Sequence, residues 1–151
     1  MKEKFFVFNK KVYYNFFIKE KINAGLILKG WEVKSLRLNK VTIINSYVTV
    51  LDKKIYVYNL DISPLKTVCN HIQFDSKRVK QLLLKKKEIE FLQNYINKKG
   101  FTIVVLGLFW KKSWCKINLA VVKGKKKHDK RNILKKKIWN VKKTRLLKKN
   151  I

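Results

Sequence analysis

The chain has 151 residues and a formal net charge of +29, from 38 Lys and Arg residues against 9 Asp and Glu residues. Hydrophobic residues make up 46% of it, which is enough for a core, so the composition excludes a wholly disordered polycation. Such a charge opposes compaction unless a polyanion neutralises it, and this favours a nucleic-acid partner, with an anionic membrane as the alternative.

The N-terminal segment, residues 1–8, is expected to be a flexible lead-in to a folded domain over residues 9–122. Its apolar run, residues 5–8, is shorter than the roughly 7–15 residues of an export signal. The longest apolar stretch, residues 101–110, is too short to span a bilayer as a helix. We therefore expect a cytoplasmic protein whose two cysteines stay reduced.

The first half of the domain carries signals for strands and one short helix. Residues 13–28 are rich in aromatic and β-branched side chains and predict a strand. Gly25, in the pair Ala24-Gly25, indicates a bulge or a close backbone approach within this strand. Residues 30–38 have helical spacing, and residues 47–51 and 55–58 flank a tight turn that predicts a β-hairpin.

The middle of the chain predicts a loop and then the longest helix of the domain. Residues 61–75 hold the single proline and predict the loop. Residues 76–99 predict the helix, because apolar residues recur there at three- and four-residue steps. Asp75 or Ser76 would cap its N-terminus, and Gly100 would follow its C-terminus.

Two further strands, residues 101–110 and 114–122, complete a set of short strands around one packed helix. This pattern predicts a mainly β fold, an OB-type antiparallel β-barrel with flanking α-helices. Residues 123–151 hold 14 Lys and Arg residues and one acid, Asp129, and their apolar residues fall on no single helical face. We expect a disordered basic C-terminal tail that becomes helical when phosphates neutralise it.

Catalytic and metal-binding signals are weak. The nine acids form no cluster suited to two-metal chemistry, and the sequence pairs neither His71 nor His128 with a nucleophile. Cys69 and His71 supply only two ligands, too few for a zinc site. We expect a protein without enzymatic activity, metal or cofactor.

Binding signals gather at the start of the tail. Residues 123–131 contain six Lys or Arg residues together with His128. Rings in such a charged setting, here His128 and Trp139, commonly stack on unpaired bases. A capping role for His128 and docking of Trp139 on the barrel are the alternatives.

Three blocks of sequence together carry a family resemblance: Asn9-Lys10-Lys11, residues 24–37 (AGLILKGWEVKSLR) and residues 124–131 (GKKKHDKR). They resemble the bacterial SsrA-binding protein family (small protein B). The resemblance implies an OB-type barrel that binds the tRNA-like domain of transfer-messenger RNA and delivers this RNA to stalled ribosomes for trans-translation. The tail would form a helix in the mRNA channel of the small subunit. We expect a monomer that does not bind membranes.

The resemblance also assigns RNA contacts to individual positions. Those facing transfer-messenger RNA are Asn9, Lys10, Lys11, Leu83, Lys116, Lys123, Lys125 and Lys126. Those in the decoding centre and the mRNA channel are His128, Asp129, Lys130, Arg131, Trp139, Lys142 and Arg145. Asn23 departs from the family, which usually has Glu there. An amide still donates and accepts hydrogen bonds, but without charge assistance the contact is weaker by about 1 kcal/mol.

Three other functions fit parts of the sequence. A ribosomal protein or another rRNA-binding module would share the charge, the small barrel and the basic tail. A small RNA-cleaving enzyme would share the charge alone. A membrane-active polycation is disfavoured by the aromatic-rich strands, since such peptides use amphipathic helices.

Overall fold

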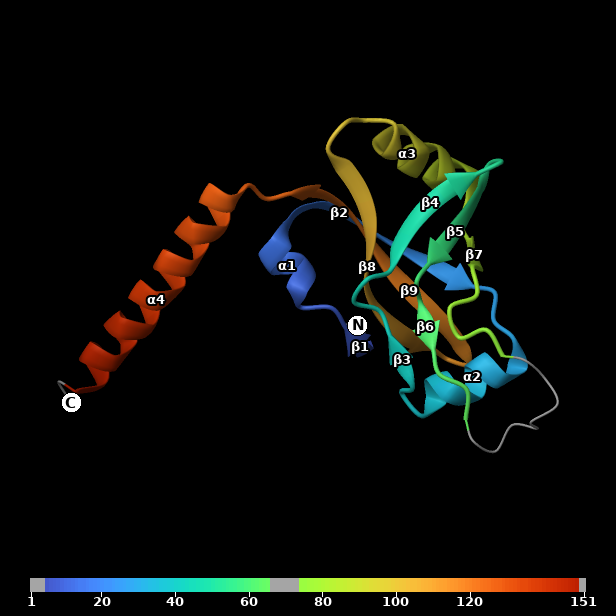
Figure 1. Cartoon of the computed structure of the whole chain (residues 1–151), viewed down its shortest axis with the longest axis horizontal. Coiled ribbons are helices and arrows are strands. Elements are labelled where there is room, and N and C mark those ends of the chain that lie inside the picture. The colour runs from blue at the N-terminus through green and yellow to red at the C-terminus, as the bar shows by residue number, and fades with distance from the viewer. Residues whose placement is uncertain (1–4, 66–73, 150–151) are drawn as a thin grey trace.

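The computed structural model describes residues 5–65 and 74–149, and its main body is a ring of six antiparallel strands (Figure 1). Each strand of the ring pairs with two neighbours, in the order β4, β8, β9, β2, β7, β5 and back to β4. Their bounds are β2 Phe16–Leu26, β4 Tyr47–Leu51, β5 Lys54–Tyr58, β7 Lys80–Leu83, β8 Phe101–Lys111 and β9 Trp114–Gly124. The predicted mainly β architecture with helices is confirmed.

Three short strands and four helices complete the structure: β1 Phe5–Phe8, β3 Val41–Thr42, β6 Asp61–Ile62, α1 Lys11–Asn15, α2 Gly30–Arg37, α3 Lys86–Ile96 and α4 Lys127–Lys149. Helices α2 and α3 lie at opposite ends of the ring, and α4 projects away from it (Figure 1). Within the described ranges, no helix is long and apolar enough to cross a membrane.

Alternation of apolar side chains along the strands builds the core inside the ring. Val57, Ile103 and Leu119 are fully buried there, and Leu92 of α3 closes one end. A second, smaller cluster lies outside the ring, where Val12 of α1 packs against Leu106, Ala120 and Val122 of β8 and β9. Helix α1 is therefore fixed on the outer surface of the longest hairpin.

The prediction of a flexible lead-in is wrong for residues 5–8, which form β1. This strand pairs with the C-terminal half of β8, with Phe5 opposite Phe109 and Phe8 opposite Gly107. The rings of Phe5 and Phe109 meet edge to face, and Phe6 stacks on Trp110. The apolar run is too short for a signal sequence but long enough to cover an open strand edge.

Substitution of Gly107 by Ala should loosen β1. A Cβ at Gly107 would lie 2.7 Å from the Val7 carbonyl oxygen and 2.8 Å from the Phe5 ring, so the strand must move. We expect Gly107→Ala to lower the free energy of unfolding by about 1–3 kcal/mol in urea denaturation. Gly124→Ala is the matched control, because a Cβ there meets nothing within 4 Å. Equal stability of the two variants would contradict the tight crossing of β1 over Gly107.

The predicted helix over residues 76–99 is also wrong in its first half. Residues 80–83 form β7, which closes the ring between β2 and β5, and the helix begins only at Lys86. The N-cap is set by Glu88, whose side chain accepts a hydrogen bond from the Lys85 amide. Asp75 instead accepts from the amide of Lys77 in a turn. The apolar residues of β7 and those of α3 follow each other in the sequence at a spacing that resembles the period of one continuous helix.

Several other predictions meet the structure directly. The helix over residues 30–38, the hairpin over 47–58 and the two last strands are present, whereas the strand predicted from residue 13 starts at Phe16 because α1 precedes it. The close approach predicted at Gly25 is confirmed, since a Cβ there would lie 3.3 Å from Leu83 Cβ. Cys69 and His71 lie outside the described residues.

Candidate nucleic-acid interface

The outer face of β7, β2 and β9 brings together three of the residues that the sequence assigned to RNA. Gly25 of β2 is paired with Leu83 on one side and with Lys116 on the other. Two residues earlier, Asn23 is opposite Asn118, whose amide nitrogen donates a hydrogen bond to its oxygen. Directly opposed residues share a face, so Leu83, Asn23 and Lys116 form one surface, which we call the β7–β2–β9 face.

An exposed tryptophan, to which the sequence had assigned no role, extends this face. Trp114 is 73% exposed at the start of β9, two residues before Lys116. It borders a hollow of about 340 Å³ together with Ile27, Leu83 and Trp110. Large exposed apolar side chains beside lysines suit base stacking. In the sequence, this tryptophan follows the turn Lys111-Lys112-Ser113, which joins the last two predicted strands.

Asn9 occupies a structural position. It is 5% exposed, its amide nitrogen donates to the Ile44 carbonyl oxygen, and its side-chain oxygen accepts from the Lys11 amide. These bonds fix the start of α1 against the loop before β4. Lys10 and Lys11 are exposed beside it and remain available to phosphate.

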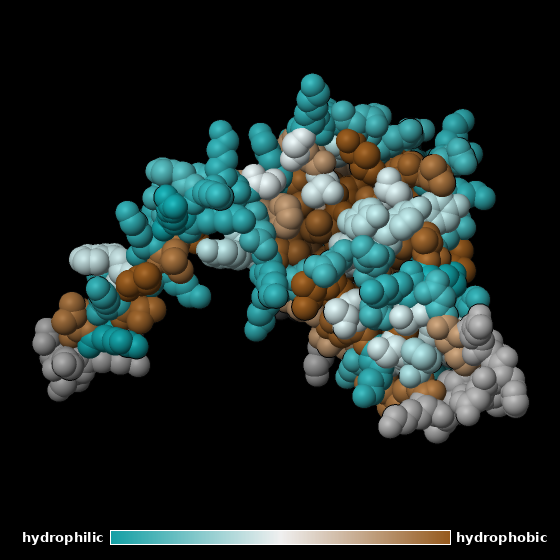
Figure 2. All heavy atoms as spheres, viewed as in Figure 1, coloured by the Kyte–Doolittle hydropathy of each residue, from teal (hydrophilic) through white to brown (hydrophobic). Residues whose placement is uncertain are grey.

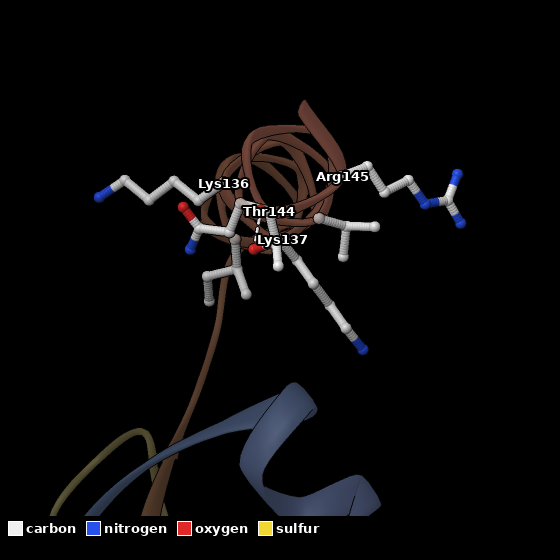
Figure 3. A pocket seen from close by; sticks show the side chains of 7 residues that line it. Lys136, Lys137, Thr144 and Arg145 are labelled. Atoms are coloured by element: carbon white, nitrogen blue, oxygen red, sulfur yellow. Dashed lines mark hydrogen bonds between the residues drawn. The ribbon is translucent and has the colours of Figure 1, made fainter. Parts of the chain in front are cut away.

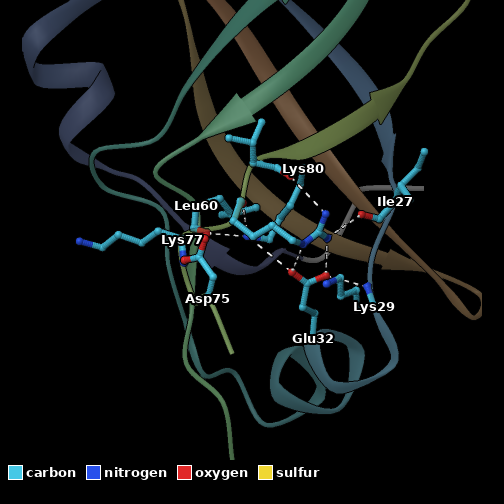
Figure 4. Close-up of polar contacts among 9 residues, drawn as sticks. Ile27, Lys29, Glu32, Leu60, Asp75, Lys77 and Lys80 are labelled. Atoms are coloured by element: carbon cyan, nitrogen blue, oxygen red, sulfur yellow. Dashed lines mark hydrogen bonds and ion pairs between the residues drawn. The ribbon is translucent and has the colours of Figure 1, made fainter. Parts of the chain in front are cut away.

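A buried ionic cluster holds β7 in place (Figure 4). Glu32 of α2 is fully buried, and Arg78 donates to its two carboxylate oxygens from Nε at 3.2 Å and Nη2 at 2.8 Å. Glu32 also accepts from the Lys29 amide at 2.6 Å and so caps its own helix. The sequence had shown Glu32 only as one of nine acids that form no catalytic cluster and as part of the block over residues 24–37.

Lys80 is the second cation of this cluster, and it is fully buried on β7. Its Nζ donates to the carbonyl oxygens of Leu60 and Arg78, both at 2.9 Å, and lies 3.7 Å from Glu32 Oε1. Burial lowers the pKa of Lys80, and the charge of Glu32 opposes that effect. The cluster therefore ties α2, β7 and the segment between β5 and β6 into one unit that positions Leu83.

The lowered pKa of Lys80 predicts a pH dependence of stability. Between that pKa and the ordinary value of 10.5, the unfolded chain binds a proton that the folded chain has released, so stability rises with pH. The free energy of unfolding of the wild type, relative to Lys80→Met, should thus increase as the pH approaches 10.5. The other lysines cancel in this difference. A difference that stays constant with pH would contradict the lowered pKa.

The start of the tail is anchored to α1. The Lys125 amide donates to the Asn15 carbonyl oxygen, and its Nζ donates to the Tyr13 carbonyl oxygen at 2.8 Å. Asp129 accepts from the Lys126 amide at 3.2 Å, so this single acid of the tail caps α4. Lys123 and Lys126 are exposed on either side of Gly124. The cations assigned to RNA here are held at one fixed end of the barrel.

Helix α4 presents its side chains to solvent around its whole circumference. Trp139 is 68% exposed, which leaves it undocked from the barrel, and Leu134, Ile138 and Leu146 are also exposed. Figure 2 shows a mostly hydrophilic rod with separate hydrophobic patches. Seen along the helix, Lys136 and Arg145 extend in opposite directions (Figure 3). The remaining cations assigned to the mRNA channel are distributed along this helix: Lys130, Arg131 and Lys142.

Neither His128 on the tail helix nor Cys115 on β9 is placed for catalysis or metal binding. On the next turn, Asn132 Nδ2 donates a hydrogen bond to His128 Nδ1 at 3.2 Å. Burial raises the pKa of the Cys115 thiol to about 12, which removes it as a nucleophile or metal ligand at neutral pH. Among the described residues, no three His, Cys, Asp or Glu side chains are grouped as a metal site would require. The arrangement is suited to binding a polyanion by shape and charge.

Three comparisons with known proteins all find similarity to the same family. A family model described as SmpB protein matches residues 6–149. The SsrA-binding protein of Buchnera aphidicola subsp. Schizaphis graminum (strain Sg) is 50% identical over 142 residues, which are 93% of this chain and 87% of that relative. A chain in a solved structure described as "tmRNA-SmpB: a journey to the center of the bacterial ribosome" aligns with a TM-score of 0.67 and 34% identity. That alignment covers 80% of this chain and 85% of the other.

Proposed function

The chain belongs to the SmpB family, and on this premise we propose that it binds transfer-messenger RNA and delivers it to stalled ribosomes for trans-translation. The observation that carries the proposal is the 50% identity with an SsrA-binding protein across nearly the whole chain. The function is binding, and the protein needs no catalytic group for it. Because this function is carried out on ribosomes, we assign the protein to the cytoplasm.

The β7–β2–β9 face is the surface we assign to the tRNA-like domain. Leu83, Trp114 and Lys116 combine apolar contact with a cation on strands of fixed register. RNA is recognised largely by shape and by phosphate position, so a rigid ring of strands is a suitable support. We assign residues 9–122 to an OB-type barrel, and we assign Asn9 the role of positioning Lys10 and Lys11.

The tail, residues 123–151, is assigned to the ribosome. Helix α4 buries no apolar side chain of its own, and its neighbouring lysines repel one another. We therefore propose that the tail is disordered in the free monomer and takes the helical form in the phosphate-lined mRNA channel. A channel that still holds mRNA excludes the tail, which restricts delivery to ribosomes that lack mRNA there.

Substitution of Lys116 tests the assignment of the face. Lys116→Ala should weaken binding of a tRNA-like-domain fragment and lower the slope of log affinity against log salt by about 1, since one phosphate contact is lost. Lys87→Ala on α3 removes the same charge from an exposed site away from the face and should leave the slope unchanged. Identical slopes for the two variants would show that the RNA lies elsewhere.

A further inference from the structure

An open groove runs along the N-terminal half of β2, and Lys125 is its one lining residue already assigned to RNA above. It has a volume of about 620 Å³ and is lined by Tyr13 of α1, by Lys125 of the tail and by the β2 residues between them. Those β2 residues are Phe16, Phe17, Ile18, Lys19, Glu20 and Lys21. We call this hollow the β2 groove.

The groove exists because one edge of β2 has no strand beside it. Residues 16–25 pair with β9, whereas the pairing with β7 covers only Gly25 and Leu26 among the described residues. Open edges invite pairing with a second chain, and a bulge with charged side chains blocks that. β2 has both, with its register shift between Ile18 and Glu20 and with Lys19 and Lys21 beside it. The edge is therefore open to a ligand other than a β-strand.

Exposed rings and ammonium groups alternate in the β2 groove. Phe17 is 50% exposed and Tyr13 is 43% exposed. Lys125 Nζ lies 4.9 Å from the centre of the Phe17 ring, and Lys21 Nζ lies 5.3 Å from that of Tyr13. Lys21 also donates to the Tyr13 hydroxyl at 3.0 Å. Each exposed ring thus has a cation within reach of any phosphate that would accompany a stacked base.

The cations outnumber the acids on the lining. Glu20 is the single carboxylate among the lining residues, against Lys19, Lys21 and Lys125. Lys19 lies 5.2 Å from the ring centre of Tyr95, so it extends the line of cations toward α3. An acidic peptide would use the ammonium groups but leave the flat rings without a partner. A nucleotide uses both, because its base stacks and its phosphate pairs with lysine.

We infer that the β2 groove binds unpaired nucleotides of an RNA strand, with bases stacked on Phe17 and Tyr13 and phosphates held by Lys19, Lys21 and Lys125. This contact requires only single-stranded RNA, so it differs from recognition of the tRNA-like domain, with Lys125 as the one residue common to both. Base stacking tolerates any sequence, because every base has a π face. The groove would hold a single-stranded segment next to the anchored start of the tail.

The test uses the full-length protein and a labelled six-nucleotide uridine oligomer. Phe17→Leu keeps the apolar bulk and removes the ring, and it should weaken binding about tenfold, which is within the range for loss of one stacked base. Phe17→Tyr should bind like the wild type. Tyr14→Leu is the matched control, because Tyr14 is 45% exposed on α1 and does not line the groove.

Crosslinking locates the contact without any substitution. An oligomer carrying 4-thiouridine should crosslink to Phe17 or Tyr13 of the wild-type protein, and a duplex competitor should displace it poorly. Crosslinks confined to the tail, or equal affinities of Phe17→Leu and Tyr14→Leu, would overturn the inference. So would loss of binding to an acidic peptide or to anionic vesicles in Phe17→Leu while oligomer binding stays unchanged. Lys116→Ala should leave oligomer binding intact, which separates this site from the β7–β2–β9 face.

Discussion

A chain that ends at Lys126 should bind transfer-messenger RNA and yet leave stalled ribosomes without a tagged peptide. This truncation removes α4 but keeps Lys123 and Lys125, whose backbone remains hydrogen-bonded to β2, β8 or α1. We expect tagging to fall to background, and affinity for the tRNA-like domain at moderate salt to change by less than about tenfold, since only nonspecific phosphate attraction is lost. The two activities are measured by peptide tagging in vitro and by RNA binding.

The physical reason lies in what orders the tail. Isolated helices are marginal in water even with good helix formers, and this one has rows of like charges and no apolar face packed on the barrel. Phosphates in the channel would remove the repulsion and select the helix. The free energy of ordering is then supplied only where that channel is vacant.

A single substitution separates helix formation from charge. Ile138→Pro leaves every cation in place but breaks the middle of α4 at a cost of about 3 kcal/mol. It should reduce tagging nearly as much as the truncation does, whereas Ile138→Ala should not. If the truncated chain also fails to bind transfer-messenger RNA, the division between face and tail is wrong. The same holds if circular dichroism finds a peptide of residues 123–151 stably helical without RNA.

How far the sequence predicted the molecule depended on whether the signal was local. The hairpin of β4 and β5, the strands β8 and β9 and the close approach at Gly25 follow from alternation and from glycine chemistry, and all of them are present. The prediction of a helix over residues 76–99 was wrong in its first half, because β7 is stabilised by pairing with β2 and β5 and not by the spacing of its own apolar residues. The prediction of a flexible segment over residues 5–8 was wrong for the same reason, since these residues form β1 by pairing with β8.

The candidate site followed the same division. The resemblance identified Leu83 and Lys116, and strand register brings both beside Gly25. The exposure of Trp114 could not be predicted, because a tryptophan at the start of a strand is as often buried in the core. The ionic cluster of Glu32 and Lys80 joins positions 48 residues apart, and no local pattern marks a buried lysine. Side chains that act by holding other elements in place are found only when the contacts are known.

The Glu32 cluster also gives the largest expected effect on stability. Glu32→Gln removes the carboxylate that pairs with Arg78 and lies 3.7 Å from Lys80, and Lys80 is then left buried without its nearest counter-charge. Breaking a buried ion pair from one side destabilises strongly, so we expect a loss of about 3 kcal/mol in the free energy of unfolding. That is a large share of the roughly 5–15 kcal/mol that holds a domain folded. Glu90→Gln, on the exposed side of α3, is the matched control and should cost less than about 0.5 kcal/mol.

The double variant Glu32→Gln/Lys80→Met shows whether the loss arises from the stranded cation. Methionine fills the volume of the lysine stem without a charge, so the double variant should be more stable than Glu32→Gln alone, with a coupling of at least about 1 kcal/mol. Urea denaturation of the four chains in the cycle measures this coupling. Additive losses would mean that Arg78 alone balances Glu32 and that Lys80 is satisfied by the carbonyl oxygens of Leu60 and Arg78. A coupled result would mean instead that Lys80 depends on a carboxylate in α2, so that α2 helps to stabilise the strand that carries Leu83 on the β7–β2–β9 face.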